Sequence, residues 1–384
     1  MESYVCPMCG NTDPKYLGIR NGHIYCRKCI SFRGTEALEE ERHFMSSKIF
    51  LDYSLSIDQQ RLSDALVRNY ISGINTLVHA VCGSGKTEIM LSTISYALSN
   101  RLTVGFAVPR RDVAIEIYDR LKTIFKRNKV IAVYGGHNDI LIGDIICLTT
   151  HQLFRYNKYF DLLILDEIDA FPYNENEVLN ALFFRSIRGY FIQMSATPSN
   201  KVLEFFKGDG YDIVELNTRY HGHPLPVPRI INRRSILKYI ELIEQLKRFE
   251  KLHKQVFIFA PTIEMCEHVF NVIRWFVKKV SFVHSKCKRR EWIIKQFKMG
   301  NIRMLVTTAV LERGVTVKDL QVIIFNSDHP LYDKAQLIQI SGRVGRKRDA
   351  PKGEVIYISE KTTDAMLESI RDIKRANKDL QDLF

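Results

Sequence analysis

The sequence predicts two tandem α/β domains with parallel sheets, preceded by a small metal-binding module. Three observations predict this organisation. The chain has 384 residues, short apolar runs alternate with helix-length amphipathic segments in two successive series, and four of the eight cysteines form two close pairs near the N-terminus. At roughly 100 to 200 residues per domain, this length fits two or three domains and excludes a single small binding module.

The two cysteine pairs lie within residues 1–35. Two residues separate Cys6 from Cys9 and Cys26 from Cys29, and sixteen residues lie between the pairs. This spacing is typical of four thiolates around one Zn²⁺, a site with no open position and therefore a structural one. The segment has no sustained periodicity, so we expect it to need the metal to fold. Its cations and tyrosines leave two alternatives open, a purely structural role or an additional contact with nucleic acid or protein.

Residues 36–55 follow as a polar connector, in which 36–42 favours a short helix. The first α/β domain is expected over 56–220, because parallel strands covered on both faces by helices appear as short apolar runs. Its strands are expected at 75–81, 102–108, 129–134, 144–148, 161–165 and 190–195. Three prolines between 224 and 228 indicate a linker at 221–228. The second domain is expected over 229–384, with strands at 255–260, 279–283, 303–307, 320–325 and 354–358.

The charge balance favours an anionic partner. The chain has 56 lysines and arginines against 43 aspartates and glutamates, a net charge of +13, which favours an acidic or phosphate-rich ligand. No apolar run reaches the roughly 18 residues of a membrane span, and the first residues lack the pattern of a signal peptide. We therefore expect a location inside the cell, where the cysteines outside the two pairs stay reduced.

Residues 80–87, Ala-Val-Cys-Gly-Ser-Gly-Lys-Thr, follow a predicted strand and precede a predicted helix over 88–99. This is the context of a phosphate-binding P-loop, although Ala80 stands where the general motif has its first glycine. In such a loop the backbone N–H groups wrap the phosphates, Lys86 reaches the β- and γ-phosphates, and Thr87 ligates Mg²⁺. The expected nucleotide-binding residues are Ala80, Gly83, Ser84, Gly85, Lys86 and Thr87.

A second motif, the acidic segment Asp-Glu-Ile-Asp at 166–169, follows the predicted strand at 161–165. A carboxylate at the end of a strand neighbouring the P-loop strand can hold the Mg²⁺ shell, and an adjacent one can activate water against the γ-phosphate. We expect Asp166 to take the first role and Glu167 the second.

Together with three further segments, these motifs resemble those of a superfamily 2 helicase or translocase. Residues 195–197, Ser-Ala-Thr, resemble motif III; 307–316, Thr-Thr-Ala-Val-Leu-Glu-Arg-Gly-Val-Thr, motif V; and 339–346, Gln-Ile-Ser-Gly-Arg-Val-Gly-Arg, motif VI. The resemblance implies two RecA-like domains that bind and hydrolyse ATP. It also implies that Arg343 and Arg346 reach the γ-phosphate from the second domain, which would make hydrolysis depend on domain closure.

The same resemblance implies further roles. Gln59 corresponds to the glutamine that reads adenine, with Gln60 as the alternative, and Gly314 of motif V joins the ATP site. The residues implied to couple ATP state to movement are Asp169, Ser195, Thr197 and Gln339. Those implied to contact the nucleic-acid backbone are Pro109, Arg110, Arg111, Thr149, Thr150, His151, Pro261, Thr262, Thr307 and Thr308. Hydroxyls, backbone N–H groups and arginines suit phosphate oxygens and carry no base code, which predicts binding with little sequence preference.

The order of these parts narrows the resemblance to one family. The four-cysteine module, Asp-Glu-Ile-Asp-Ala-Phe-Pro-Tyr at 166–173 and motif VI at 339–346 resemble the ComFA family over nearly the whole chain. That family is the late-competence ATPase of transformable Gram-positive bacteria. The resemblance implies an ATP-dependent single-stranded DNA translocase that powers DNA uptake and uses ATP, Mg²⁺ and Zn²⁺. It also implies a ComFC-type competence protein and the membrane DNA-uptake channel as partners, and a cytoplasmic location with peripheral contact at the inner face of the membrane.

Three other readings stay open at this point. A replication-restart helicase of the PriA type shares the Asp-Glu-x-Asp chemistry, but it typically has two zinc sites late in the chain. An RNA-remodelling helicase is a second alternative, because no residue here reports on the 2′-hydroxyl. A scaffold that binds ATP without hydrolysing it is opposed by the intact set Lys86, Asp166, Glu167, Arg343 and Arg346.

Overall fold

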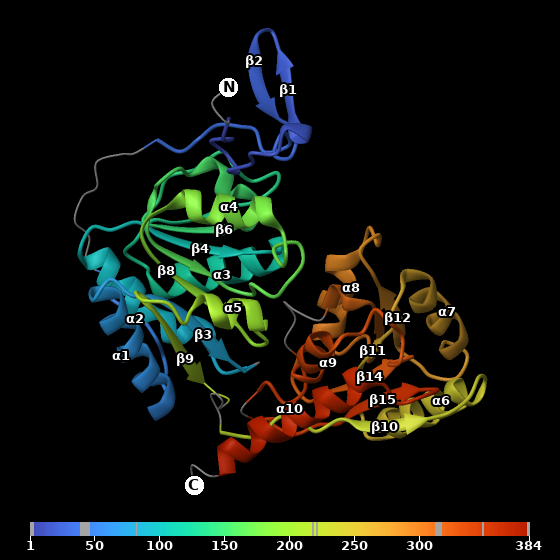
Figure 1. Ribbon diagram of the computed structural model, residues 1–384. Helices are drawn as coiled ribbons and strands as arrows, with labels where there is room; N and C mark the ends of the chain where they lie inside the picture. The colour runs from blue at the N-terminus through green and yellow to red at the C-terminus, as the bar shows by residue number, and fades with distance from the viewer. Residues whose placement is uncertain are drawn as a thin grey trace. The chain divides into compact units, whose positions relative to one another are not determined.

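The computed structural model describes residues 4–38, 47–81, 83–216, 219, 222–311, 317–347 and 349–381. Two compact units make up the chain (Figure 1). Unit 1 consists of Met1–Ala80 and Gly85–Leu216, and unit 2 of Val81–Ser84 and Asn217–Phe384. Unit 1 therefore contains the metal module together with the first sheet.

Unit 1 is built on a parallel sheet of seven strands in the order β5-β6-β4-β7-β8-β3-β9. The strands are β3 Asn75–Ala80, β4 Val104–Val108, β5 Val130–Val133, β6 Ile145–Thr149, β7 Phe160–Leu165, β8 Ile187–Ser195 and β9 Tyr211–Leu216. The helices are α1 Ile57–Ile71, α2 Lys86–Ser99, α3 Arg111–Ile124, α4 Glu177–Ser186 and α5 Asn200–Phe205, with a 3₁₀ helix η2 at Thr150–Arg155. All six expected strands are present. The edge strand β9 was not expected, because four of its six residues are only half-buried and lack a continuous apolar run.

Two apolar clusters cover the two faces of this sheet. On one face, α1, α2 and α3 pack their buried side chains against inward residues of the strands, such as Phe106 and Ile164. On the other face, α4 packs against strand residues such as Leu148 and Leu165, and the buried cysteines of the metal module belong to the same cluster. The metal module is therefore part of the packing of unit 1 and lies on the face opposite α1, α2 and α3.

The metal module contains a 3₁₀ helix, η1 Pro14–Tyr16, and an antiparallel hairpin of β1 Leu17–Arg20 and β2 His23–Cys26 (Figure 1). The hairpin was not expected from the sequence. Asn21 and Gly22 form its turn, and both have positive φ, 50° and 77°. An Asn-Gly pair is the strongest short-range signal for such a turn, so this element was visible in the sequence.

Unit 2 is built on a second parallel sheet of six strands in the order β10-β15-β14-β11-β13-β12. The strands are β10 Arg229–Asn232, β11 Gln255–Phe259, β12 Val280–Val283, β13 Met304–Thr307, β14 Leu320–Phe325 and β15 Val355–Ser359. The helices are α6 Leu237–Lys251, α7 Ile263–Ile273, α8 Arg290–Lys298, α9 Lys334–Ser341 and α10 Asp364–Gln381, with a 3₁₀ turn η3 at Ala309–Leu311. The buried side chains of α6 and α7 cover one face of the sheet, and those of α8, α9 and α10 cover the other. The edge strand β10 was not expected.

The short helix expected over 36–42 does not form in its described part, since residues 36–38 have no regular structure. Residues 39–42 lie outside the described chain. The fold class is as expected, two parallel α/β domains of the RecA-like type with a small cysteine module.

Candidate functional site

The chemistry-bearing segments of unit 1 follow strands of a fully parallel sheet, so they lie at one edge of it. The P-loop follows β3, the acidic segment 166–169 follows β7, and Ser195 ends β8. Residues 109–111 follow β4, and Thr149 is the last residue of β6, with residues 150–151 directly after it. In open parallel sheets, ligands bind outside the carboxyl ends of the strands. This edge is therefore the candidate functional site of unit 1.

The P-loop has the backbone of a phosphate cradle. Gly83 and Gly85 have positive φ, 83° and 80°, a conformation that costs glycine little and other residues more. Helix α2 begins at Lys86, and no side chain of the described residues caps its N-terminus. The amide groups of its first turn are therefore oriented toward an anion at that position. Ala80, in place of the first glycine, is the fully buried last residue of β3.

Gln59 and Gln60 were the two alternatives for the glutamine that reads adenine, and the structure places them differently. Gln59 is buried and takes part in a capping box, because Ser56 N–H donates to its Oε1 at 3.0 Å and Gln59 N–H donates to Ser56 Oγ at 3.2 Å. Its amide nitrogen lies against Gly85, where a Cβ atom would collide with it. Gln60 donates instead to Asp64 on the exposed side of α1, at 2.8 Å. Of the two, Gln59 is the residue beside the P-loop.

The acidic segment and the Ser-Ala-Thr segment are joined through one carboxylate. Ser195 Oγ donates to Asp169 Oδ1 at 2.9 Å, and Thr197 Oγ1 donates to Asp169 Oδ2 at 3.1 Å. Thr197 N–H donates to Ser195 Oγ at 3.0 Å. The loop after β7 is therefore hydrogen-bonded to the last residue of β8 and to the loop that follows it.

One sequence expectation about this edge is wrong. Strand β7, which leads to Asp166, does not neighbour the P-loop strand β3, because β8 lies between them. Motif spacing along the chain does not determine the order of strands in a sheet.

Glu167 has a φ of 60°. A non-glycine residue adopts this left-handed conformation only when its surroundings require it, as they often do at functional sites.

The residues expected to contact nucleic acid in unit 1 lie at the ends of two adjacent strands, β4 and β6. Arg111 is exposed, with its guanidinium 4.8 Å from the centre of the Tyr134 ring, and His151 is also exposed. Thr149 and Thr150 are buried, however, and the Thr150 hydroxyl has no hydrogen-bond partner among the described residues. Pro109 is buried and Arg110 half-buried. The arginines and the imidazole reach the surface, whereas the two hydroxyls do not.

In unit 2, the glycine-arginine turn after α9 is held by a residue that the sequence analysis missed. Arg219 donates to the backbone carbonyls of Gly342, Val344 and Gly345, at 3.0 Å each, and is 3% exposed. Arg346 Nε donates to the Gly342 carbonyl at 2.9 Å. No sequence signal marks Arg219, because its role depends on carbonyl groups that face it only in the folded chain.

Most of the other expected residues of unit 2 are buried or half-buried, or use their side chains in local hydrogen bonds. Gln339 and Arg343 are buried, with exposed fractions of 5% and 2%. Thr262 uses its hydroxyl to cap α7, accepting from Met265 N–H at 3.1 Å, and follows Pro261, which is half-buried. Thr307, the last residue of β13, is buried and donates to the Thr308 carbonyl at 3.1 Å. Gly314 lies outside the described residues.

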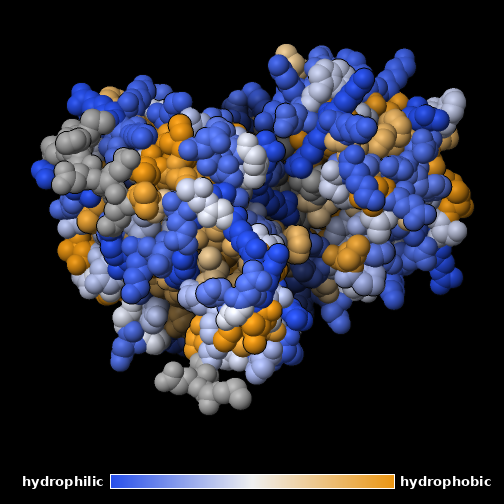
Figure 2. Space-filling model, turned by 90° about the horizontal axis from the view of Figure 1, so that it is seen from above, coloured by the Kyte–Doolittle hydropathy of each residue, from blue (hydrophilic) through white to orange (hydrophobic). Residues whose placement is uncertain are grey.

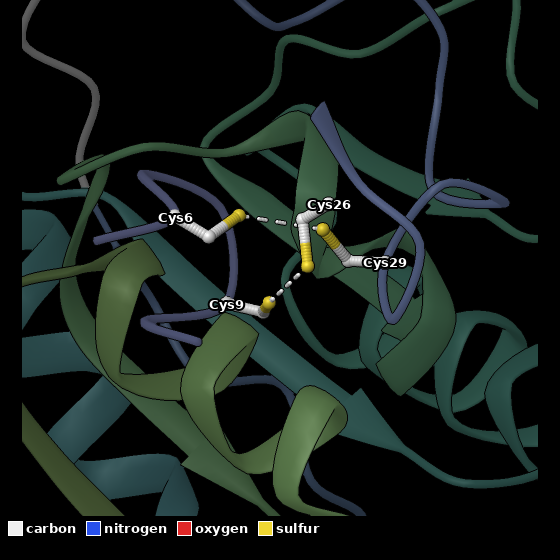
Figure 3. Close-up of side chains that lie close together, drawn as sticks. All are labelled: Cys6, Cys9, Cys26 and Cys29. Carbon is white, nitrogen blue, oxygen red and sulfur yellow. Dashed lines mark hydrogen bonds between the residues drawn. The ribbon is translucent and has the colours of Figure 1, made fainter. Parts of the chain in front are cut away.

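The four expected cysteines come together in the metal module (Figure 3). Their sulfur atoms lie within 4.8 Å of one another, with Cys6 to Cys29 at 3.6 Å and Cys9 to Cys26 at 3.7 Å. A tetrahedron with zinc–sulfur bonds of about 2.3 Å has an edge of about 3.8 Å. The sulfur positions therefore fit this metal, and they are too far apart for disulfides.

Four ionised thiolates without a metal would be unfavourable here, because the cysteines are buried and close to one another. Burial raises the pKa of Cys9 to about 11 and raises that of Cys29 further. For Cys6, burial also raises the pKa, but hydrogen bonds from the backbone of Cys9 and Met8 outweigh it and lower the net pKa. A divalent cation removes this conflict, since thiolates are its ligands and their charges then compensate its own.

The described helices include none that is long and apolar enough to cross a membrane. On the face seen in Figure 2, apolar residues form separate small patches among hydrophilic ones. The seven described cysteines form no disulfide.

Two family models match the chain. The model for DEAD/DEAH box helicases matches residues 58–205, and the model for the helicase conserved C-terminal domain matches residues 237–348. The first match covers the P-loop and the acidic segment and lies within unit 1, apart from Val81–Ser84 of the P-loop, which group with unit 2. The second match lies within unit 2.

Several bacterial proteins are similar to the chain over most of its length. Competence protein ComFA of Bacillus subtilis (strain 168) is 32% identical, over 98% of this chain and 86% of the relative. Competence protein ComFA of Streptococcus pneumoniae (strain ATCC BAA-255 / R6) is 30% identical, over 97% and 90%. ATP-dependent DNA helicase RecG of Staphylococcus aureus (strain NCTC 8325 / PS 47) is 26% identical, over 88% of this chain but only 55% of the relative.

Solved structures share the fold at low sequence identity. Saccharomyces cerevisiae Dbp5, bound to RNA and ADP BeF3, has a TM-score of 0.62 at 16% identity, over 85% of this chain and 92% of that one. Mycobacterium smegmatis helicase Lhr, bound to single-stranded DNA and AMP-PNP, has a TM-score of 0.61 at 17% identity, over 84% and 50%. RecG bound to a three-way DNA junction has a TM-score of 0.59 at 20% identity, over 86% and 47%.

Proposed function

The chain belongs to the ComFA family of competence proteins, and from that membership we propose that it is an ATP-driven translocase acting on single-stranded DNA. With both helicase domains present, it is an ATP-hydrolysing helicase of superfamily 2. The observation that carries the proposal is the shared sheet edge of unit 1. There the P-loop, the acidic segment and the two segments expected to contact DNA all follow parallel strands.

In the proposed hydrolysis step, the amides at the start of α2 and the Lys86 ammonium bind the phosphates of ATP. Thr87 and Asp166 would hold Mg²⁺, which when bound neutralises charge on the phosphate oxygens. Glu167 accepts a proton from the attacking water. Arg343 and Arg346 are proposed to stabilise the charge that develops on the γ-phosphate, as arginines supplied from a second domain do.

Coupling of hydrolysis to movement is proposed to pass through Asp169. Its two oxygens hold Ser195 and Thr197, so a change at the adjacent Asp166 and Glu167 reaches the loop after β8. Gln339 and the arginine turn are proposed to respond to the nucleotide from unit 2, where Arg219 fixes the backbone of that turn.

DNA is proposed to bind through its backbone, at the ends of β4 and β6 in unit 1 and of β11 and β13 in unit 2. Exposed Arg111 and the net charge of +13 support this proposal. Zn²⁺ is the proposed occupant of the four-cysteine site. We further propose that the activity serves DNA uptake in transformation, in the cytoplasm, with a ComFC-type protein and the membrane DNA channel as partners. The two ComFA relatives are named as competence proteins, which supports that role.

The RNA-remodelling alternative is not favoured. The likeness to Dbp5 bound to RNA is a likeness of fold at 16% identity, whereas the ComFA relatives match almost the whole chain. The replication-restart alternative is opposed by the placement of the cysteine cluster at the N-terminus.

Steady-state ATP hydrolysis tests the proposal, measured at one fixed salt concentration because binding to phosphates depends on salt. The four conditions are no nucleic acid, single-stranded DNA, duplex DNA and single-stranded RNA, with Lys86→Ala as the control for contaminating ATPases. We expect the largest stimulation with single-stranded DNA. Equal or greater stimulation with RNA would overturn the DNA assignment, and hydrolysis that no nucleic acid stimulates would overturn the translocase.

A further inference from the structure

The metal module packs against the segment of unit 1 that is expected to contact DNA. That segment is η2, Thr150–Arg155, together with Thr149 at the end of β6. Phe32, Gly34 and Thr35 of the module contact it, as does Ala37 of the connector. The contacts with this segment are of two kinds, a ring stack and hydrogen bonds to backbone groups, and ion pairs join the module to the neighbouring helix α4.

The ring stack joins Phe32 of the module to His151. The two ring centres are 6.0 Å apart and the planes are inclined by 20°. Phe32 also meets Phe154 edge-on, at 6.2 Å and 62°. The imidazole presents its flat face to Phe32, and desolvation lowers the pKa of His151, which favours the neutral ring. The residue remains exposed overall, and its remaining surface is available to a ligand.

Two hydrogen bonds, one from the Arg155 side chain and one between backbone groups, join the module and the connector to the end of η2. Arg155 Nη1 donates to the Thr35 carbonyl at 2.8 Å, and Ala37 N–H donates to the Arg155 carbonyl at 2.8 Å. The Arg155 Nε donates to Gln152 Oε1 at 2.7 Å. Gly34 fits closely against this guanidinium, since a Cβ atom there would lie 2.9 Å from Nη1. Arg155, which is 8% exposed, is thus hydrogen-bonded both within η2 and to the module.

The stack is connected directly to the metal site. Phe32 N–H donates to the carbonyl of Cys29, one of the four clustered cysteines, at 3.0 Å. A metal that fixes Cys29 therefore fixes the turn that presents Phe32. Two ion pairs join this part of the chain to α4 rather than to segment 149–155: Lys28 with Glu177 at 2.5 Å, and Arg185 with Glu36 at 2.8 Å. Their carboxylates are exposed, and such surface pairs contribute little to stability.

We propose that the metal module holds the DNA-contacting segment 149–155 in its binding conformation, with Phe32 as the positioning residue. This inference rests on the proposed function, because it takes His151 and its neighbours as part of the DNA contact. Metal loading then sets the affinity for single-stranded DNA and leaves the chemistry of ATP hydrolysis unchanged. A module that only stabilised the N-terminus would have no such effect on DNA affinity.

Three variants of the full chain separate these roles. Phe32→Ala removes the stack, Phe32→Tyr keeps a ring in the same place, and Ile19→Ala changes a 76% exposed residue of the module hairpin as the matched control. Four quantities are measured for each: zinc per chain, affinity for a fluorescent oligo(dT) by anisotropy, ATP turnover at saturating oligo(dT), and amide exchange of residues 149–156.

An aromatic contact of this kind corresponds to about three- to tenfold in an equilibrium. We expect Phe32→Ala to weaken oligo(dT) binding by about that factor and to speed amide exchange in 149–156. Zinc content and turnover at saturating DNA should stay within about twofold of the wild type. Phe32→Tyr should restore binding, and Ile19→Ala should match the wild type in all four quantities.

Unchanged oligo(dT) affinity in Phe32→Ala, with normal binding by the wild type, would overturn this inference and leave the proposed function intact. A loss of affinity that Ile19→Ala reproduces would also overturn it, since the effect would then not be specific to the stack. If the wild type did not bind oligo(dT), the proposed function and this inference would both be wrong.

Discussion

The nucleotide edge of unit 1 and the metal module lie in one compact unit, yet they are held by different chemistry. At the edge, Lys86, Asp166 and Ser195 are placed by strand ends and by hydrogen bonds between neighbouring loops. In the module, four sulfur atoms within 4.8 Å hold a short segment with one hairpin. We therefore expect that removing a side chain at the edge leaves the fold intact, whereas removing a cysteine unfolds the module. The predictions below run from the largest expected effect on ATP turnover to the smallest.

Lys86→Ala should reduce ATP turnover to background, because the loop loses the lysine that is proposed to reach the β- and γ-phosphates. Steady-state hydrolysis checks this, and circular dichroism together with zinc content should match the wild type. Glu167→Gln is the companion variant, expected to bind ATP normally but not to hydrolyse it. Wild-type turnover in both variants would remove the nucleotide edge from the mechanism.

Arg346→Ala should reduce turnover about 10³-fold, by analogy with arginines that act on the γ-phosphate from a second domain. ATP affinity, measured with a fluorescent analogue, should change much less. Arg229→Ala, in the edge strand β10, is the matched control and should behave as the wild type. A reduction in turnover that appeared equally in both variants would show that the loss is not specific to the arginine turn.

Arg219→Ala tests whether one buried side chain organises that turn. Each hydrogen bond from a charged donor is worth about 1.5–3 kcal/mol, and three carbonyls would lose this donor. We expect turnover to fall about 10- to 100-fold with ATP affinity nearly unchanged. Arg219→Lys, with a single ammonium, should recover only part of the activity. Full activity in Arg219→Ala would mean that the turn keeps its shape without this support.

Cys26→Ser should have the smallest effect on hydrolysis and the largest on structure. We expect zinc to be lost, residues 1–35 to unfold, and turnover without DNA to stay within about twofold of the wild type. Zinc analysis and amide exchange check the two structural effects. One zinc retained per chain in this variant would contradict the four-cysteine site, and abolished basal turnover would contradict the separation of the two regions.

The same contrast explains how much could be predicted from the sequence. The interior strands were predicted because burial on both faces demands apolar runs, as in β4 and β14, where every residue is buried. The edge strands β9 and β10 carry half-exposed or polar residues and resemble loops. Cysteine spacing predicted the four-cysteine cluster, because two cysteines separated by two residues can both bind one metal ion.

The rest of the site depends on contacts between distant parts of the chain. That Thr149 and Thr150 are buried while His151 is exposed follows from the fold of η2, not from residue type. The choice between Gln59 and Gln60 depends on which face of α1 meets the P-loop. The contact between Phe32 and His151 joins residues 119 positions apart in the sequence, and no local sequence pattern predicts it.

The shared apolar cluster of the module and the sheet links metal binding to the heat resistance of the whole unit. Cys6, Cys26 and Cys29 pack in the same cluster as Leu148 and Leu165 of the central strands. A ligand that binds only the folded form stabilises it by RT ln(1 + [L]/Kd). The midpoint of thermal unfolding should therefore rise with free zinc for all of unit 1, including the P-loop helix on the opposite face of the sheet. A chelator should accordingly lower the thermal stability of the ATPase before it lowers the activity.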